Sequence, residues 1–222
     1  MAVPFRIKIC GITSLADALV AADSGADAIG LNFYSLSPRC IHLQTARAIA
    51  EALPPSVEAV GVFVNETLAE IKTRAGRIGI QSLQLHGDGA LTSNPQPFRM
   101  VLATAVRGRD DMKAISERLE HCRASGWQPD AVLVDGHAPG AYGGTGVKAP
   151  WRLLADFRPG VPLILAGGLD PDNVAEAIRI VQPFGVDVAS GVERSPGKKD
   201  TDRMKRFIDN ARTAREKLPA VN

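Results

Sequence analysis

The sequence predicts an α/β fold, a closed (β/α)8 barrel, and three observations lead to this prediction. Short apolar runs alternate with longer stretches of helical period from one end of the chain to the other. Strands separated by helices pair in parallel, and a parallel sheet needs helices on its faces. The runs number eight, and a length of 222 residues suits a single barrel of eight βα units. We therefore expect one TIM-barrel domain over residues 1–222.

Each predicted strand is a short run rich in Val, Ile, Leu or Phe, with turn-forming or charged residues beside it. In chain order the strands are Phe5–Cys10, Asp27–Phe33, Glu58–Val64, Gly79–Leu85, Phe98–Ala103, Asp130–Asp135, Pro162–Leu165 and Val186–Ala189. An open doubly wound sheet is the alternative arrangement. It would call for a Gly-rich turn after the first strand, and the "CGITS" that follows that strand is not one.

The predicted helices repeat apolar residues at helical spacing, and several begin at a Ser, Thr, Asp or Pro suited to a helix start. In chain order they are Ser14–Ser24, Leu43–Leu53, Thr67–Ala75, Asp110–Cys122, Pro150–Asp156, Pro171–Ile180 and a last helix from Thr201 toward Lys217. The stretch Gly87–Pro97 contains Gly, Thr, Ser, Asn and two prolines, so we expect only a short turn of helix there.

Composition points away from several classes of protein. The formal net charge is +2, and Lys and Arg are interspersed with Asp and Glu, which does not indicate a nucleic-acid-binding surface. The 3 cysteines have no metal-ligand spacing, and their odd number suits a reducing compartment. No apolar run reaches membrane-spanning length, and too few residues precede the first strand for a signal peptide. We expect a cytoplasmic protein without a metal site.

Polar residues follow several of the predicted strands, where a barrel places its chemistry. The first strand ends at Cys10, the second leads into Arg39, the fourth into His86, and the sixth ends at Asp135. Alternation along a strand gives each side chain a direction. It predicts that Cys10, Gln84, His86 and Asp135 point into the barrel and that Phe5, Ile7, Ile9, Leu83, Leu85, Val132 and Val134 point outward to the helices.

The same alternation points Lys8 into the filled interior of the barrel. A buried lone charge costs several kcal/mol, so Lys8 needs a partner. Asp187 lies on the eighth strand, which neighbours the first in a closed barrel, and is the expected partner. Asp187 could instead contact a ligand.

Glycine-rich sequences follow the sixth, seventh and eighth strands. They are "GGTG" at Gly143–Gly146, "AGGL" at Ala166–Leu169 and "SGVE" at Ser190–Glu193. Backbone N–H groups in such loops commonly bind phosphate, and glycine allows close approach and positive φ. We expect a phosphorylated ligand here, with Gly144, Gly146, Gly167, Gly168, Ser190 and Gly191 as the binding residues.

Taken together, "KICGIT", "SPR", "VGVFVN", "QLHG", "GGTG", "LAGGL" and "GVDVASGVE" followed by "SPGKKD" resemble the phosphoribosylanthranilate isomerase family, in the family's order. The resemblance implies a cofactor-independent Amadori rearrangement in tryptophan biosynthesis on a small phosphorylated aminosugar. The sequence itself does not decide between a monomer and a homodimer. It implies that Cys10 is the general base, that Asp135 is the general acid and that Arg39 meets the anthranilate carboxylate. The glycine loops would hold the phosphate. His86 and Asp187 are candidate substrate contacts from their positions on the fourth and eighth strands. The chain departs from the family at Val147-Lys148-Ala149-Pro150, where a Phe and an Asp usually precede the Trp.

The implied chemistry sets requirements on the two reacting side chains. Asp135 would have to be protonated when substrate binds, which calls for a raised pKa. Cys10 would act as thiolate, although a free thiol with a pKa near ~8.5 is only slightly ionised at neutral pH. Lys8 or nearby helix N-termini would then favour the thiolate.

Two other functions compete with this interpretation. A related barrel isomerase, of the kind that acts on an aminoaldose phosphate in histidine biosynthesis, would prefer a carboxylate at position 10 and repetition between the half-barrels. A catalytically silent phosphate-binding barrel would not need both Cys10 and Asp135.

Overall fold

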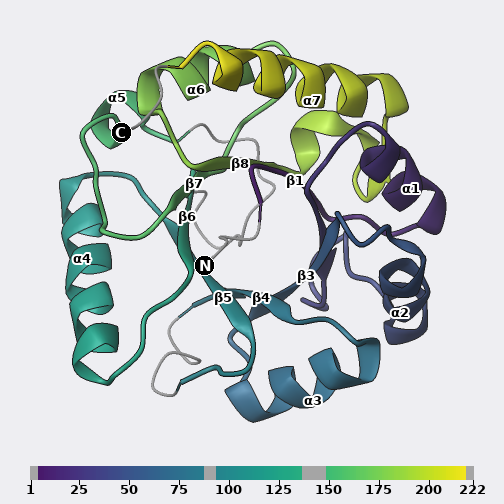
Figure 1. Ribbon diagram of the computed structural model, residues 1–222, viewed down its shortest axis with the longest axis horizontal. Coiled ribbons are helices and arrows are strands. Elements are labelled where there is room, and N and C mark those ends of the chain that lie inside the picture. Colours follow the sequence, from purple (N-terminus) through teal and green to yellow (C-terminus); the bar gives the residue numbers. More distant parts are fainter. Residues whose placement is uncertain (1–4, 88–93, 137–148, 219–222) are drawn as a thin grey trace.

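The computed structural model describes residues 5–87, 94–136 and 149–218, and these form a closed barrel of eight parallel strands surrounded by helices (Figure 1). The strands are β1 (Ile7–Cys10), β2 (Ala28–Asn32), β3 (Glu58–Val64), β4 (Ser82–His86), β5 (Arg99–Ala105), β6 (Ala131–Asp135), β7 (Leu163–Leu165) and β8 (Gly185–Val188). Pairing of β8 with β1 closes the ring. The predicted barrel of parallel strands is confirmed.

Seven α-helices lie outside the ring among the described residues. They are α1 (Leu15–Asp23), α2 (Leu43–Ala52), α3 (Leu68–Ile78), α4 (Arg109–Ala124), α5 (Trp151–Leu154), α6 (Val174–Val181) and α7 (Thr201–Glu216). Ser14 caps α1 as expected, because its side chain accepts from the N–H of Asp17. Thr67 and Glu70 form a capping box at the start of α3.

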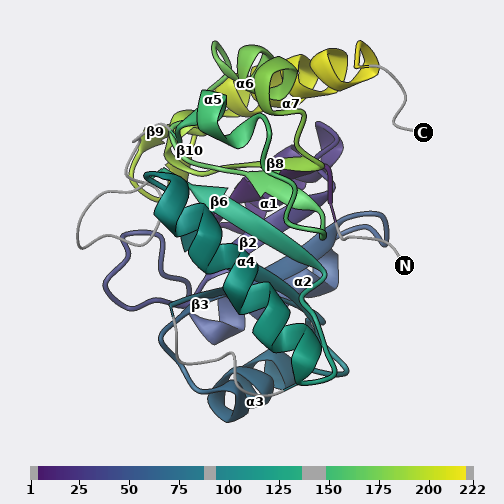
Figure 2. The same ribbon diagram turned by 90° about the vertical axis from the view of Figure 1, so that its left-hand side faces the viewer.

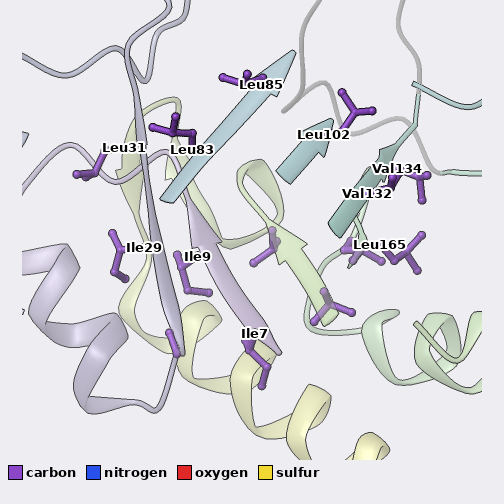
Figure 3. Packing of buried hydrophobic residues seen from close by; sticks show 14 of the residues in the cluster. Ile7, Ile9, Ile29, Leu31, Leu83, Leu85, Leu102, Val132, Val134 and Leu165 are labelled. Carbon is purple, nitrogen blue, oxygen red and sulfur yellow. The ribbon is translucent and has the colours of Figure 1, made fainter. Parts of the chain in front are cut away.

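The outward-facing side chains of the strands form the larger of two buried apolar clusters. Figure 3 shows Ile7, Ile9, Ile29, Leu31, Leu83, Leu85, Leu102, Val132, Val134 and Leu165 in this layer between strands and helices. Burial of each such side chain contributes about 1.5–3 kcal/mol. A smaller cluster fills the barrel and contains Phe5, Ala28, Val60, Val101, Ala103, Ala131, Leu133, Ile164 and Ala166.

The predicted side-chain direction is wrong for Phe5. Alternation predicts that Phe5 faces the helices with Ile7 and Ile9, but it packs in the inner cluster. The reason is that Phe5 precedes β1 and is separated from it by a bend at Arg6, so the period of two does not extend to it.

The fourth strand begins later than predicted, at Ser82 instead of Gly79. Gly79 ends α3 with φ of 85°, the left-handed conformation typical of a glycine after a helix. The helix is accordingly one turn longer than expected.

A short antiparallel pair, β9 (Glu193–Ser195) and β10 (Lys198–Lys199), was not predicted. It follows β8 through the short 3-10 helix η1 (Ser190–Val192) and lies at one end of the barrel (Figure 2).

Candidate active site

A pocket opens at the carboxyl end of the barrel strands, where the sequence places the polar residues. The space not occupied by atoms, counted to its open mouth and including solvent there, is about 590 Å³. Eight predicted site residues line it: Cys10, Arg39, His86, Asp135, Gly167, Gly168, Asp187 and Ser190. Gly191 lies in η1 behind the lining, and Gly144 and Gly146 lie outside the described residues.

Cys10 is the last residue of β1 and is 8% exposed. Its strand neighbour in β2 is Gly30, and a Cβ atom at that position would lie 2.7 Å from the Cys10 Sγ atom. The missing side chain therefore makes room for the thiol. Burial raises the pKa of Cys10, and the charge of Lys8 acts in the opposite direction. The resting group is a neutral thiol with a cation beside it.

Asp135 is the last residue of β6 and reaches the same pocket, with β7 and β8 between it and β1. Burial, helped by the negative charge of Asp187, raises the pKa of Asp135 to about 7. A large fraction of the carboxyl group is therefore protonated near neutral pH. This is the property required of a carboxylic acid that donates a proton.

Lys8 and Asp187 form the predicted ion pair inside the barrel. The Lys8 ammonium lies 2.9 Å from Asp187 Oδ1 and donates a second hydrogen bond of 2.8 Å to Gln84 Oε1. Burial alone would lower the pKa of Lys8, but the charges of Asp187 and Cys10 more than compensate and raise it. Lys8 thus remains a fixed positive charge on β1, two residues before Cys10.

His86 lies next to this network. Its Nε2 atom is 2.9 Å from the Gln84 side-chain amide nitrogen. Burial, and then the nearby Lys8 charge, lower the pKa of His86 to about 4. His86 is therefore neutral at physiological pH and suited to hydrogen bonding with a ligand.

Arg39 lies on the loop after β2 and is buried against a residue that the sequence analysis did not single out. Its Nε and Nη2 atoms donate to the two carboxylate oxygens of Glu193 at 2.9 and 2.7 Å. Lys199 also donates to Glu193, at 2.9 Å. Glu193 and Lys199 belong to the motifs "SGVE" and "SPGKKD", but nothing in the sequence pattern relates these motifs to Arg39.

The glycines after β7 and β8 bring two loops into close contact. Gly167 has φ of 84°, and a Cβ atom there would lie 2.0 Å from the Gly136 nitrogen and 2.6 Å from Asp135 Oδ1. A Cβ atom at Gly191 would lie 1.8 Å from the Leu169 carbonyl oxygen. Neither contact tolerates a side chain, so the backbone itself forms this wall of the pocket.

Asn32 is a second residue that the sequence analysis left out. It lines the pocket at 8% exposure, accepts from the N–H of Tyr34 at 2.8 Å and donates to the Ser37 hydroxyl. Asn in a loop after a strand is common in turns, so its type alone gave no functional signal.

Within the described residues, no group of three or more His, Cys, Asp or Glu side chains is placed to hold a metal ion. No helix in the same part of the chain has both the length and the apolar character to span a membrane. What the pocket does offer is a carboxyl group that can donate a proton and a thiol that can accept one as thiolate, with the buried cation Lys8 on the same strand as the thiol. Such a set can move protons on a bound ligand.

The family model for N-(5'-phosphoribosyl)anthranilate (PRA) isomerase matches residues 7–210. The N-(5'-phosphoribosyl)anthranilate isomerase of Magnetococcus marinus is 45% identical over 95% of this chain and 97% of its own length. The relative of the same name from Geobacter sulfurreducens is 44% identical over 93% and 98%.

Solved structures agree. The phosphoribosyl anthranilate isomerase of Thermotoga maritima superposes with a TM-score of 0.83 at 40% identity, covering 94% of this chain and 99% of that one. A phosphoribosyl anthranilate isomerase in complex with reduced 1-(o-carboxyphenylamino)-1-deoxyribulose 5-phosphate superposes with a TM-score of 0.80 at 39% identity, with the same coverage.

Proposed function

The chain belongs to the N-(5'-phosphoribosyl)anthranilate isomerase family of tryptophan biosynthesis, and on this premise we propose that Asp135 and Cys10 are the acid and base of its reaction. One observation carries the proposal. A carboxyl group with a pKa of about 7 and a thiol beside a buried ammonium open into one pocket from β6 and β1.

The reaction needs proton transfers at the ring oxygen and at C2, both of which are bonded to C1 of the sugar. Asp135, as a carboxylic acid, donates its proton to the ribose ring oxygen; the C1–O bond breaks, and the anthranilate nitrogen forms a Schiff base with C1. Cys10, as thiolate, then removes the proton from C2, which gives an enolamine. Tautomerisation of the enolamine, with a proton added at C1 and one lost from the C2 hydroxyl, gives the ketone 1-(2-carboxyphenylamino)-1-deoxyribulose 5-phosphate. The cation Lys8 favours the thiolate over the thiol and so acts in the direction this step requires.

The substrate carries two anionic groups, and the pocket has a candidate site for each. Arg39 binds the anthranilate carboxylate, because a guanidinium matches a carboxylate with two parallel hydrogen bonds. The backbone of Gly167, Gly168, Ser190 and Gly191 binds the phosphate, together with Gly144 and Gly146. The relative solved with a phosphorylated, o-carboxyphenyl ligand supports a ligand of this chemistry.

His86 and Asp187 are the remaining substrate contacts in the proposal. His86 is neutral and donates or accepts a single hydrogen bond to the sugar. Asp187 is held by Lys8 at 2.9 Å and lines the pocket. We propose that the chain is a monomer or a homodimer; a Thermotoga maritima relative is described as dimeric. A cytoplasmic location also stays a prediction.

Complementation of a tryptophan-requiring host that lacks this isomerase tests the function, and purified variants test the roles. We expect growth with the wild-type chain and none with Cys10→Ala or Asp135→Asn. Each variant should lose about 10²–10⁴ in turnover, the usual contribution of a general acid or base, while substrate still binds. Cys122→Ala is the matched control, since Cys122 is a buried cysteine of α4 outside the pocket. Near-normal turnover in either test variant would remove that residue from the mechanism.

A further inference from the structure

Three charged side chains form a buried chain beside the pocket: Arg39, Glu193 and Lys199, which are 8%, 8% and 2% exposed. Glu193 is the central member. It accepts a two-bond fork from Arg39 on one side and a 2.9 Å hydrogen bond from the Lys199 ammonium on the other. Lys199 also donates to the Ala189 carbonyl oxygen at 2.9 Å.

The β9–β10 pair holds this charge chain in place. Lys199 lies opposite Glu193 in the pairing register. The turn between the strands packs on the loops after β1 and β2: Thr13 donates to the Gly197 carbonyl oxygen at 2.6 Å, and a Cβ atom at Gly197 would lie 2.7 Å from the Pro38 oxygen. Figure 2 shows this hairpin at one end of the barrel. The hairpin and the Arg39 loop therefore meet at two points, the close approach of Gly197 to Pro38 and the fork between Arg39 and Glu193.

The charges of the chain do not cancel. Two cations share one carboxylate, which leaves an excess of one positive charge in a region largely removed from water. The pKa of Glu193 is lowered, because Arg39 and Lys199 outweigh the effect of burial, so the carboxylate stays ionised. Of the three residues only Arg39 lines the pocket. An anionic group of the ligand would meet the excess charge there.

The fork also fixes the orientation of Arg39. Glu193 takes the edge of the guanidinium that carries Nε and Nη2. The edge formed by Nη1 and the second hydrogen of Nη2 has the geometry for another two-bond contact with a carboxylate. The stem of Arg39 is confined as well, since a Cβ atom at Gly11 would lie 2.5 Å from its Cδ atom.

We propose that Glu193 is a positioning residue that presents Arg39 to the substrate's ring carboxylate and so sets the specificity for a carboxyl-bearing aromatic amine. The inference rests on the carboxylate role of Arg39 given above. A purely structural Glu193, which only anchored the hairpin, would affect all ligands of the pocket alike. A positioning Glu193 affects only ligands that carry the carboxylate.

Glu193→Asp is the sharpest test, because it keeps the charge and shortens the side chain by one methylene, which breaks the fork. The probes are reduced 1-(o-carboxyphenylamino)-1-deoxyribulose 5-phosphate and its phenylamino counterpart without the carboxyl group, with affinities measured by calorimetry. We expect Kd for the first to rise about tenfold, which corresponds to about 1.4 kcal/mol, and Kd for the second to change less than about twofold. KM for substrate should rise in parallel with little change in kcat, because Arg39 does not touch the reacting sugar atoms.

Glu58→Asp is the matched control. Glu58 pairs with Arg99 and Ser82 at the start of β3, where a shortened carboxylate should affect melting temperature but neither ligand. Arg39→Ala should abolish the preference for the carboxylated ligand. If Arg39→Ala keeps the preference, the carboxylate role of Arg39 fails and the inference fails with it. If Arg39→Ala loses the preference and Glu193→Asp keeps it, only the inference is overturned.

A second variant, Glu193→Gln, tests the proposal if Glu193→Asp fails to fold. Glu193→Gln keeps the side-chain length and one acceptor oxygen, and we expect it to show a smaller loss of the same preference. Equal weakening of both ligands in either variant, or failure of both variants to fold, would give Glu193 a structural role and overturn the proposal.

Discussion

At the scale of single residues, burial shifts the pKa of both Cys10 and Asp135 upward, but with different consequences. In the proposed mechanism the neutral acid is the reactive form of Asp135, so burial prepares Asp135 for that role. The thiolate is the proposed reactive form of Cys10, so burial opposes that role and Lys8 offsets part of the cost. The requirement for a raised Asp135 pKa follows from the chemistry alone. Its cause, desolvation with help from Asp187, becomes visible only in the fold.

The pH dependence of kcat/KM should report these two groups. The proposed mechanism requires protonated Asp135 and ionised Cys10. Below pH 7 Asp135 holds its proton and the rate rises tenfold per pH unit with the thiolate fraction. Above the Asp135 pKa of about 7, the fraction of protonated Asp135 falls as fast as the fraction of Cys10 thiolate rises, so the profile becomes flat. It should fall only above the raised pKa of Cys10.

The Asp135→Asn variant tests which group causes the profile of kcat/KM against pH to change slope, or break, near pH 7. Its residual activity needs only the thiolate, so kcat/KM should keep rising through pH 7 instead of levelling. A break near pH 7 that survives in Asp135→Asn would show that another group, on enzyme or substrate, produces it.

At the scale of elements, the strands and the direction of their side chains followed closely from the sequence, because a strand has a period of two and the helix-facing side must be apolar. The exceptions lie where local rules end, at Phe5 before β1 and at Gly79 after α3. The β9–β10 pair was missed for a different reason. Its strands have 3 and 2 residues, too few to show any period, and they are charged.

Gly167 tests whether the loop after β7 positions the acid. Gly167→Ala would put a methyl group on Gly136 and Asp135 at a residue with φ of 84°. We expect a loss of about 1 kcal/mol or more from the left-handed backbone and a loss of about 10²-fold in kcat/KM from a displaced carboxyl group. Melting temperature and steady-state kinetics measure the two effects.

Gly79→Ala separates backbone strain from displacement of the acid. Gly79 has nearly the same φ, 85°, but a Cβ atom there meets nothing within 4 Å. The control should lose similar stability from strain and keep its kcat/KM. If Gly167→Ala also keeps its kcat/KM, the loop does not hold Asp135 in position.

At the scale of the whole molecule, the closed ring is what brings Cys10, Asp135 and the glycine loops after β7 and β8 to one mouth. The sequence predicts this ring from the number and spacing of its runs, and with it the Lys8–Asp187 pair, because closure makes the first and eighth strands neighbours. It did not predict the Arg39–Glu193–Lys199 chain. Those contacts join the loop after β2 to the hairpin after β8, and no periodicity relates two loops that far apart.

The Lys8–Asp187 pair should therefore stabilise the barrel at its closing seam. Lys8 and Asp187 are direct register partners between β1 and β8, and Lys8 is 0% exposed. Lys8→Met leaves Asp187 and Gln84 without their donor, and losing one member of a buried pair costs about 3–5 kcal/mol. For a chain of this size that lowers the melting temperature by about 6–20 °C. Lys198→Met, at an exposed lysine of β10, should leave the melting temperature unchanged.

Because Lys8 also favours the Cys10 thiolate, Lys8→Met should lower kcat even at temperatures where the variant is fully folded. A variant with the parent's melting temperature would mean that the pair does not secure the seam, whatever its effect on turnover.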